Sequence, residues 1–264
     1  MSTFTEPFSA SSGDPFWVGL VDDAATFPPG DAPLDAALTA YADRAGPAAR
    51  LVRSLVVRDT DLPQVPAGTP VSVVLTGGAG QVHGPAQLCQ RRDLPLAGLE
   101  IALRDVDDPA GNARRVVAAV DAARGEGVLD EDTPVFVELP AVDPAYSWLA
   151  AADEVAAAEL RLKLRTGGLD PDAFPTPERL AAWIDAALDR ELPFKCTAGL
   201  HRALPHVDAD GCAHHGFLTL LAATRVAFDG GSPDDVVSTL RRDDPTDLLT
   251  LDLAGARRWF TSFG

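Results

Sequence analysis

Lysine is almost missing from this chain. Of its 22 basic residues, only Lys163 and Lys195 are lysines, and the other twenty are arginines. Arginine can keep a surface charged as well as lysine can, so this chain uses arginine for that task. Arginine does not lose its proton, whereas a buried lysine can become a neutral amine nucleophile. The two remaining lysines therefore suggest amine chemistry.

Cysteine is also scarce, and its spacing argues against the usual cysteine frameworks. Cys89, Cys196 and Cys212 are odd in number, far apart and form no C-x-x-C pair, which disfavours disulfides and a structural zinc site. Residues 1–14 form a polar segment without a basic or apolar signal region. No apolar run approaches the roughly eighteen residues of a membrane span. We expect a cytoplasmic protein with no membrane partner.

Positive charge is in deficit as well. The net charge of −17 argues against nucleic-acid binding and against a polybasic membrane contact. An anionic substrate would have to meet a local positive pocket inside a globally negative field. The expected partner is therefore a small molecule.

Short apolar runs alternate with longer Ala/Leu-rich segments of helical spacing. The runs of strand character are Trp17–Val21, Val52–Val57, Val71–Leu75, Ala97–Leu103, Val135–Leu139, Leu160–Leu164, Phe194–Thr197 and Trp259–Phe263. The helical segments are Leu34–Arg44, Ala110–Arg124, Tyr146–Ala157 and Pro177–Arg190. Such alternation is typical of a parallel sheet covered on its outer face. Eight strands in this length predict a single-domain (β/α)8 TIM-type barrel over residues 15–264.

The pattern has three irregularities. The link at residues 59–70 is rich in Pro and Gly and too short for a full helix, whereas the link at residues 201–258 has room for at least two helices. The chain ends at Gly264, so we expect a truncated eighth βα unit. A doubly wound sheet is the alternative fold.

Polar residues gather where the predicted strands end. They are Asp22, Asp23, Glu100 or Arg104 on the fourth strand, Glu138, Lys163, Lys195 and, just after the seventh strand, His201. In a (β/α)8 barrel the C-terminal strand ends meet at one mouth, which is where the active site lies. These scattered residues are therefore predicted to form one site.

The two lysines lie on consecutive predicted strands, which are about 4.8 Å apart in a sheet. Mutual repulsion and burial are both expected to lower the pKa of one amine. The neutral amine would attack a carbonyl, and the resulting imine would act as an electron sink. Glu138 and Asp22 are the candidates to move protons or orient the amines. The alternative is that one lysine forms a buried salt bridge with Glu138.

Two lysine motifs resemble those of the class I deoxyribose-phosphate aldolases. The segment K-L-R-T-G-G at Lys163–Gly168 is similar to the family's K-T-S-T-G-[FY], and K-C-T-A-G-L at Lys195–Leu200 is similar to its K-A-S-G-G-I. Weaker echoes occur at Asp22 and Glu138. The resemblance implies a (β/α)8 barrel aldolase with the Schiff-base lysine at Lys163 and a supporting lysine at Lys195.

The chain departs from that family at three places. In Glu100-Ile101-Ala102, alanine stands where the family has its catalytic aspartate. The chain also ends before the family's phosphate-binding loop after the eighth strand. Finally, the long link after the seventh strand carries four of the five histidines. The resemblance therefore supports the fold and the amine chemistry better than the substrate.

Several further residues are expected to bind substrate. Arg165 is the best candidate to hold a carboxylate or phosphate. The other predicted substrate-binding residues are Asp23, Glu100, Thr166, Gly167, Gly168, Thr197, Gly199, His201 and His215. The H-x4-H and C-x-H-H spacings around Cys212 do not match a common zinc motif. We therefore expect no metal and no cofactor.

Three functions are compatible with this pattern. The first is a Schiff-base aldolase or lyase acting on a small carbonyl compound. The second is a metal-assisted barrel lyase or isomerase in which Glu100 and Glu138 hold a divalent cation and a lysine is the base. The third is a barrel that binds a small molecule without catalysis. A homodimer is expected because two-fold dimers are the commonest soluble assemblies.

Overall fold

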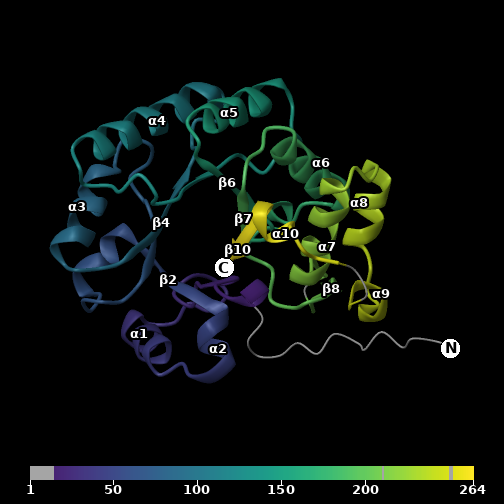
Figure 1. Ribbon diagram of the computed structural model, residues 1–264, viewed down its shortest axis with the longest axis horizontal. Helices are drawn as coiled ribbons and strands as arrows, with labels where there is room; N and C mark the ends of the chain where they lie inside the picture. The colour runs from purple at the N-terminus through teal and green to yellow at the C-terminus, as the bar shows by residue number, and fades with distance from the viewer. Residues whose placement is uncertain (1–14, 210, 250–251) are drawn as a thin grey trace.

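The computed structural model describes residues 15–209, 211–249 and 252–264. The predicted polar segment 1–14 lies outside the described residues. Within the described ranges, every helix is too short or too polar to cross a membrane. Figure 1 shows the strands gathered at the centre of the molecule with the helices around them.

Eight parallel strands close into a barrel. They are β1 Val21–Asp23, β2 Val52–Arg58, β3 Val71–Val74, β4 Leu96–Ala102, β5 Val135–Glu138, β6 Arg161–Arg165, β7 Phe194–Thr197 and β10 Phe260–Phe263. The closed order is β1-β10-β7-β6-β5-β4-β3-β2, with all neighbours parallel. The predicted (β/α)8 barrel is confirmed. A doubly wound sheet is ruled out because β1 pairs with both β2 and β10, which leaves no edge.

The helices lie outside this ring. They are α1 Leu34–Ala42, α2 Gly46–Leu51, α3 His83–Arg91, α4 Pro109–Gly125, α5 Tyr146–Ala157, α6 Pro177–Leu188, α7 Phe217–Phe228, α8 Pro233–Leu240, α9 Pro245–Leu249 and α10 Ala256–Trp259. Short 3-10 helices occur at η1 Pro15–Trp17, η2 Asp59–Gln64 and η3 Pro171–Ala173. Three of the α-helices, α4, α6 and α8, begin with proline after a side chain that caps the first turn. Proline is favoured there because the first helical N–H has no partner in the helix.

The irregular links lie where they were predicted. Between β2 and β3 the chain forms only η2, which buries Leu62 and leads to the buried Val65. Between β7 and β10, the described residues form a two-stranded hairpin, β8 His206–Val207 with β9 Ala213–His214, followed by the four helices α7 to α10. The hairpin lies near α7 in Figure 1. The predicted last strand is confirmed at Phe260–Phe263, and one residue follows it.

Some boundaries were predicted wrongly. Trp17, the first residue of the first expected strand, instead ends the helix η1, and a left-handed turn at Gly19 (φ 63°) delays the strand to Val21. Helix α3 was missed because its first turn contains Gly84 and Pro85, which read as a loop although proline is tolerated at that position. Strand β1 thus ends at Asp23 rather than at Val21, whereas the other seven strands end within one residue of their predicted ends.

The interior of the barrel is polar where most such barrels are packed with aliphatic side chains. Alternation along β6 explains how this arises. Leu162 and Leu164 face outward and belong to the apolar core, so Lys163 faces inward with Arg165. Inward side chains of other strands add Asp22 and Glu100, both almost fully buried. The barrel therefore encloses charge.

Candidate active site

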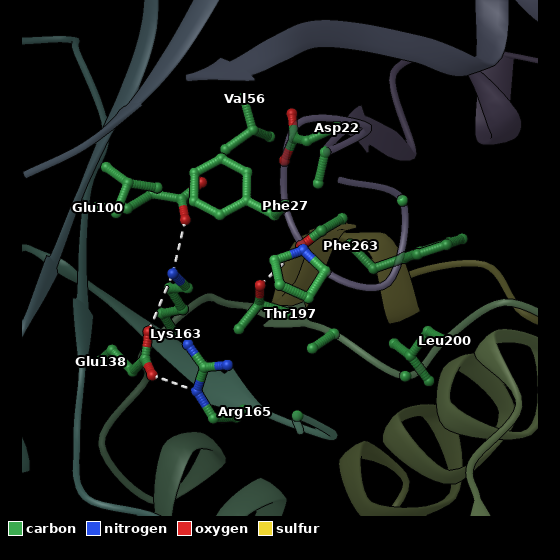
Figure 2. Close-up of a pocket in the computed structure, with 18 of the residues that line it drawn as sticks. Asp22, Phe27, Val56, Glu100, Glu138, Lys163, Arg165, Thr197, Leu200 and Phe263 are labelled. Carbon is green, nitrogen blue, oxygen red and sulfur yellow. Dashed lines mark hydrogen bonds and ion pairs between the residues drawn. The ribbon is translucent and has the colours of Figure 1, made fainter. Parts of the chain in front are cut away.

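A pocket of about 860 Å³ opens at the C-terminal ends of the strands. Its walls include residues from β1, β4, β5, β6 and the turns after β6 and β7. Among the charged side chains lining it are Glu138, Lys163 and Arg165, which Figure 2 shows pointing toward one another. The predicted convergence of strand ends on one mouth is therefore present in the structure.

Side chains of alternating charge form a continuous chain of ion pairs across the barrel. In spatial order they are Arg165, Glu138, Lys163, Glu100, Lys195, Asp22 and Arg53. Every carboxylate in this chain lies between two cations. We call this set the charge chain.

Lys163 occupies the part of the charge chain that reaches the pocket. Its Nζ lies 2.8 Å from Glu100 Oε2 and 2.9 Å from Glu138 Oε2. On the far side of Glu138, Oε1 accepts a hydrogen bond of 2.6 Å from Arg165 Nε. The dashed lines in Figure 2 follow this path. The predicted alternative of a lysine–Glu138 salt bridge is what the structure contains.

Lys195 occupies the buried part. Its Nζ donates to Asp22 Oδ2 and to Glu100 Oε1, both at 2.6 Å. Its side chain has no exposed surface, whereas that of Lys163 retains 5% exposure, and only Lys163 of the two lines the pocket. Lys163 and Lys195 are register partners on β6 and β7. Glu100, from β4, therefore separates two amines that the sheet alone would place side by side.

Asp22 is saturated with hydrogen bonds. Besides Lys195, it accepts from Ser54 Oγ at 2.9 Å, from Ser262 Oγ at 2.8 Å and from Arg53 Nε at 3.1 Å. Its side chain is fully buried. Each of its oxygens thus accepts two hydrogen bonds, an arrangement that orients Lys195, which is one of the two roles predicted for Asp22. The other role, moving protons, stays a prediction.

For Lys163, the expected depression of the amine pKa is wrong. Burial lowers the pKa of Lys163, but the adjacent carboxylates of Glu100 and Glu138 outweigh it and raise that pKa above its ordinary value. Burial likewise raises the pKa of Glu100, but the two lysines outweigh it and bring that pKa to about 2. The prediction considered the repulsion between the lysines and omitted the carboxylate between them.

These shifts predict loss of stability in acid. Because the pKa of Glu100 is about 2 when folded and 4.5 ordinarily, the unfolded chain binds the extra proton between these values. The stabilising contribution of Glu100 to the free energy of unfolding should therefore be fully present above about pH 4.5. It should be lost as the pH drops toward 2, which lowers the free energy of unfolding by about 3 kcal/mol. Urea unfolding followed by circular dichroism at about pH 5 and about pH 3 tests this. Equal unfolding free energies at the two pH values would contradict it.

Glu100 supplies a carboxylate near the position where the aldolase family has its catalytic aspartate and this chain has alanine. Ala102, at the position of the family's aspartate, lines the pocket without a charge. The carboxylate of Glu100, two residues earlier on the same face of β4, reaches both lysines instead. Glu100 was predicted to bind substrate and does line the pocket, but each of its carboxylate oxygens already pairs with a lysine amine. Its position between them indicates a role in setting the lysine charges.

The glycine-containing turns after β6 and β7 pack closely against each other. Thr166 Oγ1 donates to Ala198 O at 2.6 Å, and a Cβ on Gly167 would lie 2.9 Å from Gly199 Cα. Thr166 and Gly167 do not line the pocket, so their predicted substrate contacts are not supported. Gly168, Thr197 and Gly199 do line it. Thr166 and Gly167 instead join the turns after β6 and β7 below the mouth.

Substitutions at Ala198 and Gly199 are predicted to change the free energy of unfolding in opposite directions. Both have left-handed backbones, with φ of 63° and 79°. Ala198→Gly should raise the free energy of unfolding by up to about 1 kcal/mol, because glycine adopts this region without strain. Gly199→Ala should lower it by more than about 1 kcal/mol, because the new Cβ would lie 2.8 Å from Thr166 O. Thermal unfolding of the matched pair checks both signs, and similar shifts in the same direction would refute the assignment.

The remaining predicted residues divide between the pocket and the core. Asp23 and His201 line the pocket, and Asp23 pairs with Arg44 at 2.5 Å. His215 is buried, with Nε2 2.8 Å from Pro175 O, and it does not line the pocket. The prediction of substrate binding by His215 is therefore not supported. Its ring instead ties the start of α7 to the loop before α6.

Two further arginines line the pocket, and one of them was not predicted. Arg104, named from the sequence as a candidate at the end of the fourth strand, follows β4 and donates to Thr76 O at 2.6 Å. Arg44, which follows α1, was not predicted, because it reads as an ordinary surface residue among twenty arginines. The signal available was position, since Arg44 lies within a few residues of a helix end on the side of the mouth.

Neither a protein-family model nor a curated protein matches this sequence. The resemblance to the class I aldolases therefore depends on the two lysine motifs and their neighbours.

Proposed function

We propose that the protein is a Schiff-base enzyme, an aldolase or related lyase, in which Lys163 attacks the carbonyl carbon of a small substrate. The observation that carries this is the unequal placement of the two lysines: Lys163 borders the pocket, whereas Lys195 is sealed beneath it. The (β/α)8 fold is commonly enzymatic, with chemistry at this mouth.

A protonated Lys163 must first lose a proton. Glu138 is the acceptor with access to the pocket, since its Oε2 lies 2.9 Å from Nζ and its side chain is 12% exposed. Transfer of that proton leaves a neutral amine and a neutral carboxyl group. The amine attacks the carbonyl carbon to form a carbinolamine, the carboxyl group protonates the departing hydroxyl, and water leaves to give the imine. The protonated imine then accepts the electron pair of the breaking C–C bond, while the carboxylate of Glu138 takes the proton of the substrate hydroxyl whose carbon becomes the second carbonyl.

The rim favours an anionic substrate. Arg165 donates a hydrogen bond from Nε to Glu138, and no described residue hydrogen-bonds its two terminal nitrogens. Arg44 and Arg104 line the same pocket. A carboxylate or phosphate group would meet these guanidinium groups although the chain as a whole carries a net charge of −17. Small keto acids and sugar phosphates are therefore the substrate classes to test first.

The metal-assisted alternative receives less support. It requires Glu100 and Glu138 to share a divalent cation, but the ammonium of Lys163 lies between these two carboxylates at 2.8 and 2.9 Å. A cation would have to displace that amine. The expectations of a cytoplasmic location and of a homodimer stay predictions.

Borohydride reduction tests the proposal directly. The full chain is incubated with small aldehydes, keto acids and sugar phosphates, reduced, and analysed by intact mass and peptide mapping. Only Lys163, Lys195 and the N-terminal amine can carry an adduct. An adduct on Lys163 supports the proposal, and one on Lys195 reverses the two roles. No adduct with any carbonyl would refute imine chemistry; a ligand-dependent rise in melting temperature without turnover would then favour the binding barrel.

A further inference from the structure

The hairpin between β7 and α7 gathers metal-binding side chains outside the charge chain. His206 on β8 and His214 on β9 are directly opposite in the antiparallel register, so their side chains lie on the same face. Asp208, two residues after His206, extends from that face at the hairpin turn. The two imidazole rings stack with centroids 4.8 Å apart.

The donor atoms of these three residues converge. His214 Nε2 lies 3.1 Å from Asp208 Oδ2, and His206 Nε2 lies 3.4 Å from Asp208 Oδ1. All three donor atoms are within 4.8 Å of one another. Ligands bound to zinc at about 2.1 Å in a tetrahedron are about 3.4 Å apart. The spacing is thus close to that of a coordination shell.

The opposite ring nitrogens are oriented by the backbone. His214 Nδ1 lies 3.1 Å from Gly199 O, and His206 Nδ1 lies 3.4 Å from Leu204 O. An Nδ1–H that donates to a carbonyl leaves the lone pair on Nε2, which is the arrangement of metal-bound histidines. His214 is also buried and packed against the Phe174 ring at 4.7 Å.

A hydrogen-bonded cluster without a metal accounts poorly for these contacts. Each ring has an oxygen close to both of its nitrogens, whereas a neutral imidazole carries a single N–H. Two neutral rings therefore leave two of these four nitrogen–oxygen contacts without a proton. A metal ion would use the two Nε2 lone pairs and would place its charge between the rings and the carboxylate.

We propose that His206, Asp208 and His214 bind one divalent transition-metal ion of the zinc class. Two imidazoles and one carboxylate suit zinc and its neighbours, whereas magnesium and calcium prefer all-oxygen sites. Three protein ligands leave a position for water or a substrate oxygen. Through Gly199, which lines the pocket, the bound ion would also anchor the hairpin to the turn after β7. This site does not depend on the chemistry proposed for Lys163.

The test uses the full chain after removal of metals with a chelator. Titration calorimetry with zinc should give one ion per chain, and cobalt should give the visible absorption of a tetrahedral site. His206→Gln, His214→Gln and Asp208→Asn should each weaken zinc binding by about a hundredfold or more. His83→Gln is the matched control, because His83 pairs with Glu126 at 2.8 Å in an exposed two-residue contact; it should bind zinc normally.

Circular dichroism confirms that each variant is folded before its affinity is compared. Zinc binding that survives in all three ligand variants would overturn the proposal. So would the absence of stoichiometric zinc and cobalt binding in the parent chain, or magnesium binding of equal affinity at the same residues. Loss of zinc binding in His83→Gln would place the ion elsewhere.

Discussion

Lys163→Arg should abolish the borohydride-trapped adduct and lower turnover by more than about 10³-fold. Arginine keeps a positive charge near Glu100 and Glu138, so much of the electrostatic environment of the charge chain is retained. It cannot supply a neutral amine, because the guanidinium does not lose its proton. Intact mass after reduction and steady-state kinetics on the trapped carbonyl compound measure the two losses. The variant therefore separates the effect of the positive charge at position 163 from that of the nucleophilic amine.

Lys195→Arg is the matched control for that experiment. Its amine lies 2.6 Å from both Asp22 and Glu100 and has no exposed surface, so it has no path to substrate in this geometry. The variant should still form the adduct on Lys163, at a reduced rate, provided that it folds. An adduct lost in Lys195→Arg and kept in Lys163→Arg would transfer the nucleophilic role to Lys195.

Glu100→Gln should lower the free energy of unfolding by about 3–5 kcal/mol. Glu100 is the carboxylate between the two lysines, and its replacement leaves each buried ammonium with one anionic neighbour, Glu138 for Lys163 and Asp22 for Lys195. The same change removes an interaction that raises the pKa of Lys163. Adduct formation in the folded variant should therefore extend to lower pH. Urea unfolding and a pH profile of trapping measure the two effects.

A double-mutant cycle separates charge from packing in that result. Lys195→Met removes the second amine, so the pair Glu100→Gln with Lys195→Met restores the charge balance of the interior. The double variant should be less destabilised than the sum of the two single variants, with a coupling of about 1–3 kcal/mol. Additive losses would show that the Glu100–Lys195 contact contributes through shape alone. Glu154→Gln serves as a control, because its ion pair with Arg114 is at the surface and should contribute less than about 1 kcal/mol.

The barrel was predictable because its signals are local. Apolar runs such as Val71–Leu75 and Val135–Leu139 are near-continuous, as is typical of a sheet buried on both faces. The runs that carry the lysines, Leu160–Leu164 and Phe194–Thr197, are followed by glycine-containing turns, so the polar residues at the strand ends could be assigned to one mouth before the structure was known. The scarcity of lysine singled out Lys163 and Lys195 for the same reason: it is a property of composition that does not depend on contacts.

Pairing between charges was not predictable in this way. Adjacent strands place Lys163 beside Lys195, and from that alone repulsion is the natural expectation. The side chain of Glu100, however, enters from β4, far from either lysine in sequence, and reverses the sign of the electrostatic effect on Lys163. In a closed barrel, inward side chains contact one another across the axis as well as on neighbouring strands. The pKa of Lys163 on β6 therefore depends on carboxylates from both β4 and β5.

The order of residues along the chain thus established the strands, their burial on both faces and the amine-bearing mouth, because strand periodicity and turn chemistry act over a few residues. Folding in three dimensions assigned the roles inside it. Burial distinguishes the pocket-lining Lys163 from the sealed Lys195, and the pairing of β8 with β9 brings His206, Asp208 and His214 together. These outcomes depend on distances across the barrel and the hairpin, and electrostatic and metal-binding energies change steeply with such distances.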